Sequence, residues 1–455
     1  MNERSFRNPK LGGAFLVAYK AFADLAAKGS LFIVTVAAAR VLTPRAFGIF
    51  ALGATLGWIV AVVTDFGIQL HLARAVARRP SEAPALLRAW LRVRLWMAAA
   101  APIAIAGGAW VSAWSREYAV PISLFAIVYA CNGLVEFLHY FYRGLSRSDL
   151  ESSLTLWQRG ATLVCALAAL AWRPDVTALA IAMLVPSVAT LVVSLRIALG
   201  NRWVRPDELS AGADPRVGPT ADPRVGSSVD PASFPWVAFR RDVWPIGVGI
   251  VLSALYFRID VFLVQLWSGT EAVGLYNAVF RLVEALRLFP AAVIAVALPS
   301  LFRGRDLRPL VLAAAPITAG AVAVTAVLWT AAGWLIPHLF AQRYEAAVPA
   351  FRILLLSFPL MSLNMALTHQ LVGWGGQRAY AGLCAVALVV NLALNARLIP
   401  ALSIDGAAWA TLATEVFLTI GCVVVLARLK GSRLRSPRAD GSLGGASAPE
   451  REVIA

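Results

Sequence analysis

The sequence contains few charged residues for its length. Of its 455 residues, 15% are charged and 59% are hydrophobic, and the mean hydropathy is +0.71. An average soluble domain has about 25% charged residues, because it must cover its own surface with polar groups. The composition therefore excludes an ordinary soluble protein and indicates an integral membrane protein.

Residues that bind metals or support catalysis are also scarce. There are only four histidines and four cysteines, and the cysteines all lie inside apolar stretches as isolated residues: Cys131, Cys165, Cys384 and Cys422. Such cysteines behave as small hydrophobic residues. Neither a GxxxxGK[ST] phosphate loop nor an HExxH zinc motif occurs. We therefore expect no cofactor, no metal and no enzymatic activity.

Acidic residues are few in comparison with basic ones, at 25 against 41. The basic residues lie between apolar stretches and do not gather on one compact domain, so their excess does not indicate a nucleic-acid partner. It indicates how the chain is oriented in a membrane.

Long apolar stretches make up most of the chain. A hydrocarbon core about 30 Å thick requires about 20 helical residues to cross it. Twelve stretches qualify: 14–39, 47–64, 95–114, 120–142, 155–172, 176–195, 243–267, 275–302, 310–335, 348–372, 379–398 and 407–427. They lack the period-2 alternation of a membrane β-barrel. The sequence thus predicts an all-α polytopic membrane protein with about 12 transmembrane helices.

The distribution of Lys and Arg predicts the orientation. If the N-terminus is cytoplasmic, the cytoplasmic segments carry about four times as many Lys and Arg as the outer ones. Both termini are therefore predicted to be cytoplasmic. The polar N-terminal residues are not followed by a short apolar region with a cleavage site, so we expect no removable signal peptide.

The longest connection contains a tandem duplication, ADPRVG at 213–218 and again at 221–226. Rich in Pro, Asp and Gly, it is predicted to be a disordered cytoplasmic linker. The predicted organisation is an N-terminal six-helix lobe at 1–200, the linker at 201–241, a C-terminal six-helix lobe at 242–430 and a disordered cytoplasmic tail at 431–455.

The two halves show a weak internal similarity. Residues 40–50, RVLTPRAFGIF, align with residues 266–276, LWSGTEAVGLY, and the alignment pairs Gly48 with Gly274. Similarity at matching places in two halves is typical of two-lobed transporters built from repeats.

Several motifs carry a resemblance to a known family. ARVLTPRAFGIFAL, TDFGI, YFRIDVFLV, GTEAVGLYNAVFRLVE and ALPSLF resemble motifs of the oligosaccharide flippase family, the O-antigen and polysaccharide exporters of the multidrug/oligosaccharidyl-lipid/polysaccharide (MOP) superfamily. The resemblance covers all twelve predicted spans. It implies two six-helix lobes around a central cavity, alternating access, and a polyprenyl-diphosphate-linked sugar as substrate. The duplicated linker and the tail depart from the family pattern, but both lie outside the transport core.

The first predicted span contains three charged residues, Lys20, Asp24 and Lys28, which steps of four place on one helical stripe. Charged side chains at mid-membrane cost roughly 2.5 to 3.5 kcal/mol each. The chain has only four lysines, and a buried Lys, unlike Arg, can release its proton and then a bound anion. The stripe is therefore a candidate substrate site, although a self-neutralising ion-pair ladder would give the same pattern.

A second polar stripe is expected in the eighth span, formed by Asn277, Arg281, Glu284 and Arg287. Lining of the cavity and polar packing between helices both explain it.

The seventh span carries Arg258 and Asp260 within YFRIDVFLV. Two residues correspond to about 200° around a helix, so the two side chains point in nearly opposite directions and need different partners. We expect one to face the cavity and the other a neighbouring helix. Weaker candidates are Glu136, His139, Arg159 and Glu415, and a helix-to-helix bonding role is expected for Asn391 and Asn395.

Three functions are compatible with these features. The first is a flippase for a lipid-linked oligosaccharide, used in the assembly of O-antigen, capsule or exopolysaccharide. The second is an ion-coupled multidrug exporter of the same superfamily, although buried bases outnumber what a carrier of cations would need. The third is a membrane-embedded polysaccharide polymerase or glycosyltransferase, which would need a large catalytic loop.

The flippase interpretation also specifies a location and partners. It places the chain in the inner or plasma membrane of a bacterium or archaeon, surrounded by the lipid bilayer. Its partners would be the polyprenyl-diphosphate-linked sugar and the polymerase and glycosyltransferases of the same pathway.

Overall fold

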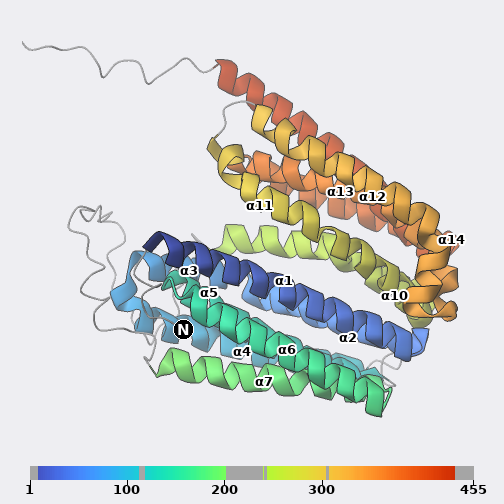
Figure 1. Cartoon of the computed structure of the whole chain (residues 1–455), viewed down its shortest axis with the longest axis horizontal. Coiled ribbons are helices and arrows are strands. Elements are labelled where there is room, and N and C mark those ends of the chain that lie inside the picture. Colours follow the sequence, from blue (N-terminus) through green and yellow to red (C-terminus); the bar gives the residue numbers. More distant parts are fainter. Residues whose placement is uncertain (1–8, 112–117, 201–238, 240–242, 304–306, 436–455) are drawn as a thin grey trace, which may run out of the picture.

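The computed structural model describes residues 9–111, 118–200, 239, 243–303 and 307–435. Within these ranges the chain forms helices joined by short turns, with no strand (Figure 1). Ten of the described helices are long and apolar enough to cross a membrane. The predicted fold class, an all-α polytopic membrane protein, is thus confirmed.

The N-terminal lobe contains six of these ten helices. Its elements are α1 (Pro9–Val41), α2 (Pro44–Asp65), α3 (Ile68–Arg78), the 3-10 helix η2 (Pro80–Glu82), α4 (Ala83–Val111), α5 (Ala119–Gly144), α6 (Ser148–Trp172) and α7 (Val176–Leu199). Local chemistry explains the starts: Thr43 accepts a bond from the Ala46 amide at 3.2 Å, and Asp175 accepts from the amides of Thr177 and Ala178.

The short helix α3 lies in a segment that the sequence pattern left between two spans. It is strongly amphipathic and buries Ile68, Leu72 and Val76. At its start, the Asp65 carboxylate accepts bonds from the amides of Gly67 and Gln69, at 3.1 and 3.3 Å. An 11-residue helix is too short to cross a bilayer, and mixed polarity hid it from a search for apolar stretches.

The C-terminal lobe is built from fewer, longer elements. They are α10 (Trp244–Leu286), α11 (Leu288–Arg303), α12 (Arg308–Phe340), the 3-10 helix η6 (Gln342–Ala347), α13 (Val348–Gly373) and α14 (Gln377–Arg435). The eighth span, predicted as one stretch at 275–302, is interrupted at Arg287, between α10 and α11.

Two of the long elements are hairpins of two spans each. The backbone leaves helical geometry at Gly269 in α10 and at Ser403 in α14. In α10, residues on either side of Gly269 meet as antiparallel neighbours, as in the hydrogen bond between Tyr276 and Asp260. In α14, Asn391 donates to Thr414 across the turn. The ten elements therefore provide the twelve predicted spans.

The two lobes meet along α2 and α10 (Figure 1). Gly48 packs against the backbone of Thr270, Gly274 packs against the backbone of Pro44, and a Cβ at either glycine would collide with a carbonyl oxygen. At the other end of α2, Gly247 lies against the Phe66 ring. The two glycines paired by the internal similarity are thus direct neighbours at the lobe interface.

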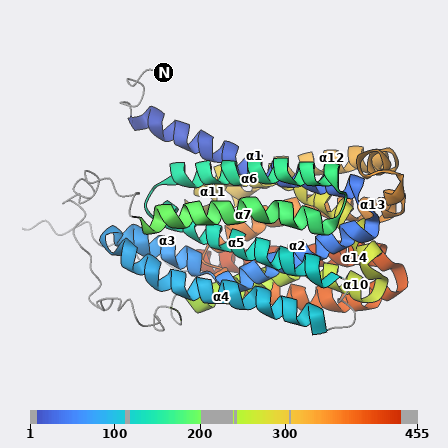
Figure 2. The same ribbon diagram turned by 90° about the horizontal axis from the view of Figure 1, so that it is seen from below.

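The chain ends of the two lobes lie on one side of the bundle. The end of α7 and the start of α10 are both at that end of the bundle (Figure 1), and Ala198 and Val243 belong to one hydrophobic cluster. Figure 2 shows the first part of α1 projecting away from the side of the bundle near this end. Nearly all of the predicted linker, and the tail beyond Arg435, lie outside the described residues.

Candidate functional site

A group of charged side chains lies inside the C-terminal lobe, where α10 folds back on itself. Arg258 Nη2 donates to Glu284 Oε2 at 2.7 Å, and Arg281 Nη1 donates to the same oxygen at 2.8 Å. The Arg258 side chain is only 4% exposed. One carboxylate therefore serves two guanidinium groups.

Aromatic rings pack against Arg258 and Arg287. The Arg258 guanidinium lies 4.9 Å from the centre of the Phe280 ring, and both Arg258 and Arg287 lie over Phe257. Arg258 Nη1 and Arg287 Nε are buried without a hydrogen-bond partner. Cation–π contacts offset part of the cost of burial, but two donors stay available to an acceptor.

Asp260 points away from Arg258, as the 200° separation predicts. Its carboxylate accepts from Tyr276 Oη at 2.5 Å and from the Val261 amide at 2.9 Å. Tyr276 Oη also lies 3.4 Å from Thr411 Oγ1. Both charged residues of YFRIDVFLV thus find partners on the returning half of α10, and the partners differ.

A second buried carboxylate lies near Asp260. Glu415 accepts from Tyr256 Oη at 2.9 Å and from Asn364 Nδ2 at 2.7 Å. Both carboxylates line a small cavity of about 10 Å³ together with Asn391 and Thr411, which is roughly the volume that one water molecule needs. In the described part of the chain, neither carboxylate has an arginine within 4.0 Å.

The N-terminal lobe holds a separate charged group around Glu151. Its carboxylate accepts two hydrogen bonds from Arg143, of 2.5 and 2.8 Å, and one from Lys20 Nζ, of 2.8 Å. The Glu151 side chain is 2% exposed, while those of Arg143 and Lys20 are 37% and 28% exposed. Lys20 therefore joins α1 to α5 and α6 through a buried carboxylate.

The other two residues of the α1 stripe are placed differently. Asp24 lies 3.5 Å from Lys20 and is half exposed, and Lys28 is exposed and forms no ion pair among the described residues. The three side chains share a stripe but do not form one continuous ladder. No described contact joins this stripe to the arginines of the C-terminal lobe.

The remaining sequence candidates have mainly local partners. Asn277 donates to the Val273 carbonyl within its own helix, and its Oδ1 is buried without a partner. His139 is buried, with Nε2 unpartnered. Asn391 and Asn395 are both buried, and Asn391 bonds across the α14 hairpin to Thr414.

Sequence reasoning missed two charged groups. The buried Glu151 and its partner Arg143 lie just outside the predicted spans 155–172 and 120–142. Arg94 is 1% exposed and lies 3.9 Å from Asp65, with its Nη2 bonded to the Gly133 carbonyl. TDFGI contains Asp65, but nothing in that motif indicates a partner 29 residues further along the chain.

Comparisons with solved structures support the fold. The lipid II flippase MurJ, in an inward closed conformation, superposes with a TM-score of 0.66 at 10% identity, covering 91% of this chain and 90% of that one. A multidrug resistance MATE family transporter in an inward-facing conformation gives 0.62 at 15% identity, covering 92% and 96%. A MOP superfamily transporter from Pyrococcus furiosus gives 0.54 at 16% identity, covering 92% and 94%.

No curated protein matches the sequence significantly. The family model described as polysaccharide biosynthesis protein matches residues 17–305, which is more than half of the chain and includes both α2 and α10. The chain belongs to the polysaccharide biosynthesis protein family.

Proposed function

We propose that this protein is a flippase that moves a polyprenyl-diphosphate-linked oligosaccharide across the inner membrane by alternating access. The observation that carries the proposal is the group of arginines at the returning half of α10. Arg258 and Arg281 share one carboxylate, Glu284, Arg287 directly after α10 has no ion pair among the described residues, and two buried guanidinium nitrogens lack a partner. A diphosphate supplies the negative charge and the acceptor oxygens that such a group lacks.

The two-lobed fold supports the transport mechanism. The lobes meet through backbone contacts between α2 and α10 at Gly48 and Gly274. Lobes related by a repeat can rock against each other about such a contact and open a central cavity to one side or the other. The family match to polysaccharide biosynthesis favours a sugar-bearing lipid over other anions.

The charge of the site argues against the competing functions. An exporter of cationic drugs would need acidic side chains free to face its cargo, whereas Glu284 is held by two arginines and Glu415 by neutral donors. A polymerase or glycosyltransferase would need a catalytic loop or domain, and the described connections between spans are short. We therefore assign no enzymatic activity.

The proposal also includes location and partners. By the positive-inside distribution, both termini lie in the cytoplasm of a bacterial or archaeal cell. The polymerase and glycosyltransferases that make and consume the lipid-linked sugar would work beside it.

Reconstituted transport tests the proposal. We would measure the flipping of a polyprenyl-diphosphate-linked oligosaccharide in proteoliposomes with Arg287→Gln. Arg287 forms no ion pair among the described residues, so its removal deprives none of their carboxylates of a counter-ion. We expect flipping to fall by about tenfold or more, the effect of losing one charge-assisted contact. Arg397→Gln, at an exposed arginine of α14, is the control.

Two outcomes would contradict the proposal. The first is a wild-type protein that exports organic cations and does not flip the lipid-linked sugar. The second is an Arg287→Gln variant that flips as fast as the Arg397→Gln control.

The lysines of α1 provide a separate prediction. If the stripe contacts the diphosphate, Lys20→Ala and Lys28→Ala each reduce flipping while the protein still inserts and folds. Lys28 is the cleaner test because it forms no ion pair among the described residues. Accumulation of the lipid-linked intermediate in the cytoplasmic leaflet, normalised to folded protein, is the measurement. Normal export by both variants would remove α1 from the substrate site.

A further inference from the structure

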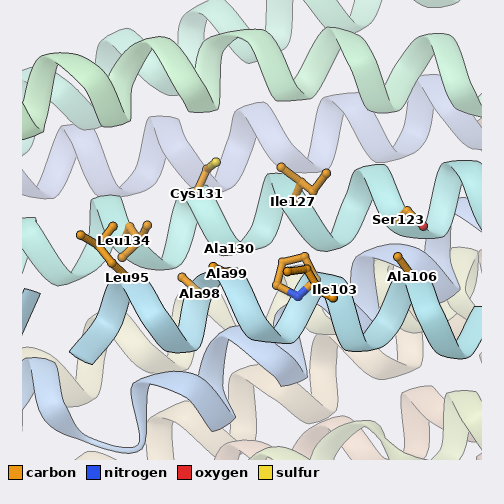
Figure 3. Close-up of a pocket in the computed structure, with 11 residues that line it drawn as sticks. Leu95, Ala98, Ala99, Ile103, Ala106, Ser123, Ile127, Ala130, Cys131 and Leu134 are labelled. Carbon is orange, nitrogen blue, oxygen red and sulfur yellow. The ribbon is translucent and has the colours of Figure 1, made fainter. Parts of the chain in front are cut away.

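An apolar groove runs along the side of the N-terminal lobe, between α4 and α5. Its volume is about 410 Å³. Residues of both helices line it (Figure 3): Leu95, Ala98, Ala99, Pro102, Ile103 and Ala106 from α4, and Ser123, Ile127, Ala130, Cys131 and Leu134 from α5. Small side chains hollow the surface here, because alanine leaves room where a larger residue would fill the space between the helices.

The length of the groove matches one leaflet of a bilayer. From Leu95 to Ala106 the helix rises about 17 Å, and a hydrocarbon core is about 30 Å thick. The groove is thus about as long as one leaflet is deep. Trp96, 78% exposed beside Leu95, is a residue type enriched at membrane surfaces.

Two arginines extend the face of α4 that lines the groove. Arg88 precedes Leu95 by seven residues and Arg92 precedes Ala99 by seven, so each lies almost directly in line with a lining residue. Both side chains are exposed. Their Nε atoms bond only to backbone carbonyls of the preceding turn, and in the described chain neither has a carboxylate partner.

We infer that this face of the N-terminal lobe is a binding site for an anionic phospholipid. Its phosphate lies on Arg88 and Arg92, and one acyl chain lies in the groove. A guanidinium group binds two phosphate oxygens at once through parallel N–H groups. The apolar groove binds the acyl chain. A groove of this length suits an acyl chain, whereas a polyprenyl chain is several times longer.

Photolabelling tests the site in the full-length protein. Phosphatidylglycerol with a photoreactive group in its acyl chain, in nanodiscs of phosphatidylcholine, should label peptides of α4 and α5. The double variant Arg88→Gln/Arg92→Gln should show at least tenfold less labelling, because the loss of even one charge-assisted contact lowers binding by about that factor. Arg196→Gln, an exposed arginine near the end of α7 in the same lobe, should leave labelling unchanged.

A matched pair of variants tests the groove itself. Ala99→Trp fills the groove and should abolish labelling, whereas Ala100→Trp adds the same side chain at an exposed position outside the lining and should not. Labelling by a photoreactive phosphatidylcholine to the same extent would overturn the headgroup assignment. Displacement of the label by an equimolar polyprenyl diphosphate would overturn the assignment to a phospholipid.

The inference is independent of the transport proposal. It concerns a surface that includes none of the proposed substrate residues. Loss of labelling with normal flipping would still support the lipid site.

Discussion

The best-buried charged side chains of this membrane protein have partners that helix geometry brings into reach. Arg258 and Asp260, two residues apart, point to opposite sides of α10 and contact different residues on its returning half, Glu284 and Tyr276. In the N-terminal lobe, Glu151 has the corresponding role and holds two cations. Removal of a shared carboxylate is therefore more costly than removal of either cation.

Glu151 and Asp24 should differ sharply when each loses its charge. Glu151→Gln leaves Arg143 and Lys20 without their buried counter-ion, and we expect the free energy of unfolding to fall by about 2 to 3 kcal/mol, because both cations are part-exposed. Asp24→Asn should change it by less than about 1 kcal/mol, since Asp24 is half exposed. Thermal unfolding in detergent measures both, and a larger effect at Asp24 would contradict the structure.

At the scale of helices, the positions of glycine and proline determine where elements begin, turn and touch. Pro44 starts α2, Gly269 reverses α10, and Gly48 and Gly274 allow the two lobes to approach backbone to backbone. The equivalent reversal in α14 occurs at Ser403, which adopts φ 51°. A residue with a Cβ is strained at this φ, whereas glycine is not. Pro400 shortly before it limits the regular helix there.

Gly48→Ala should disrupt the lobe interface. A Cβ at Gly48 collides with the Thr270 carbonyl oxygen, and both atoms belong to backbone that cannot move aside without separating α2 from α10. We expect destabilisation of about 2 kcal/mol or more. Gly108→Ala in α4 is the control, because its Cβ meets no atom within 4 Å and the change should stabilise the helix by roughly 0.5 to 1 kcal/mol. Equal stability of the two variants would refute the contact.

Substitutions at the two reversals, Gly269 and Ser403, should change the stability of the protein in opposite directions. Gly269 has φ 83° and ψ 178°, a region accessible almost only to glycine, so Gly269→Ala should destabilise the protein by about 1 to 3 kcal/mol. Ser403→Gly relieves a left-handed φ and should be neutral or stabilise by up to about 1 kcal/mol. Unfolding temperatures of the two variants, compared with wild type, check both signs.

For the whole molecule, the number of spans determines which connections share a side of the membrane. From Trp244 to Gly269, α10 covers about 38 Å, enough to cross the hydrocarbon core once. The start of α10 and the turn at Gly269 therefore lie on opposite sides. The distribution of Lys and Arg then predicts which side is cytoplasmic.

Accessibility labelling checks this topology. In a variant with its four native cysteines replaced, single cysteines introduced at 268–271 should react with an impermeant maleimide added to whole cells. Cysteines introduced at 211–228 should react only after the membrane is opened. The reverse pattern would place both termini outside and would reverse the proposed direction of transport.

Most of the fold can be predicted from the sequence, because long apolar stretches form membrane helices. A segment such as 176–195 has no stable alternative to a membrane helix, because its backbone polar groups must be satisfied within the segment. The same principle predicts twelve spans. It could not detect α3, whose polarity is mixed, nor the break at Arg287, which lies inside an otherwise apolar stretch.

Partnerships between charged residues were decided only by the tertiary structure. Helical spacing predicts which faces carry Lys20 and Arg258, and it predicts that Arg258 and Asp260 have different partners. It does not predict that Glu151 comes from α6 to meet Lys20 across 131 residues. Local sequence determines the helices because their hydrogen bonds are local, whereas ion pairs between helices depend on how the lobes pack.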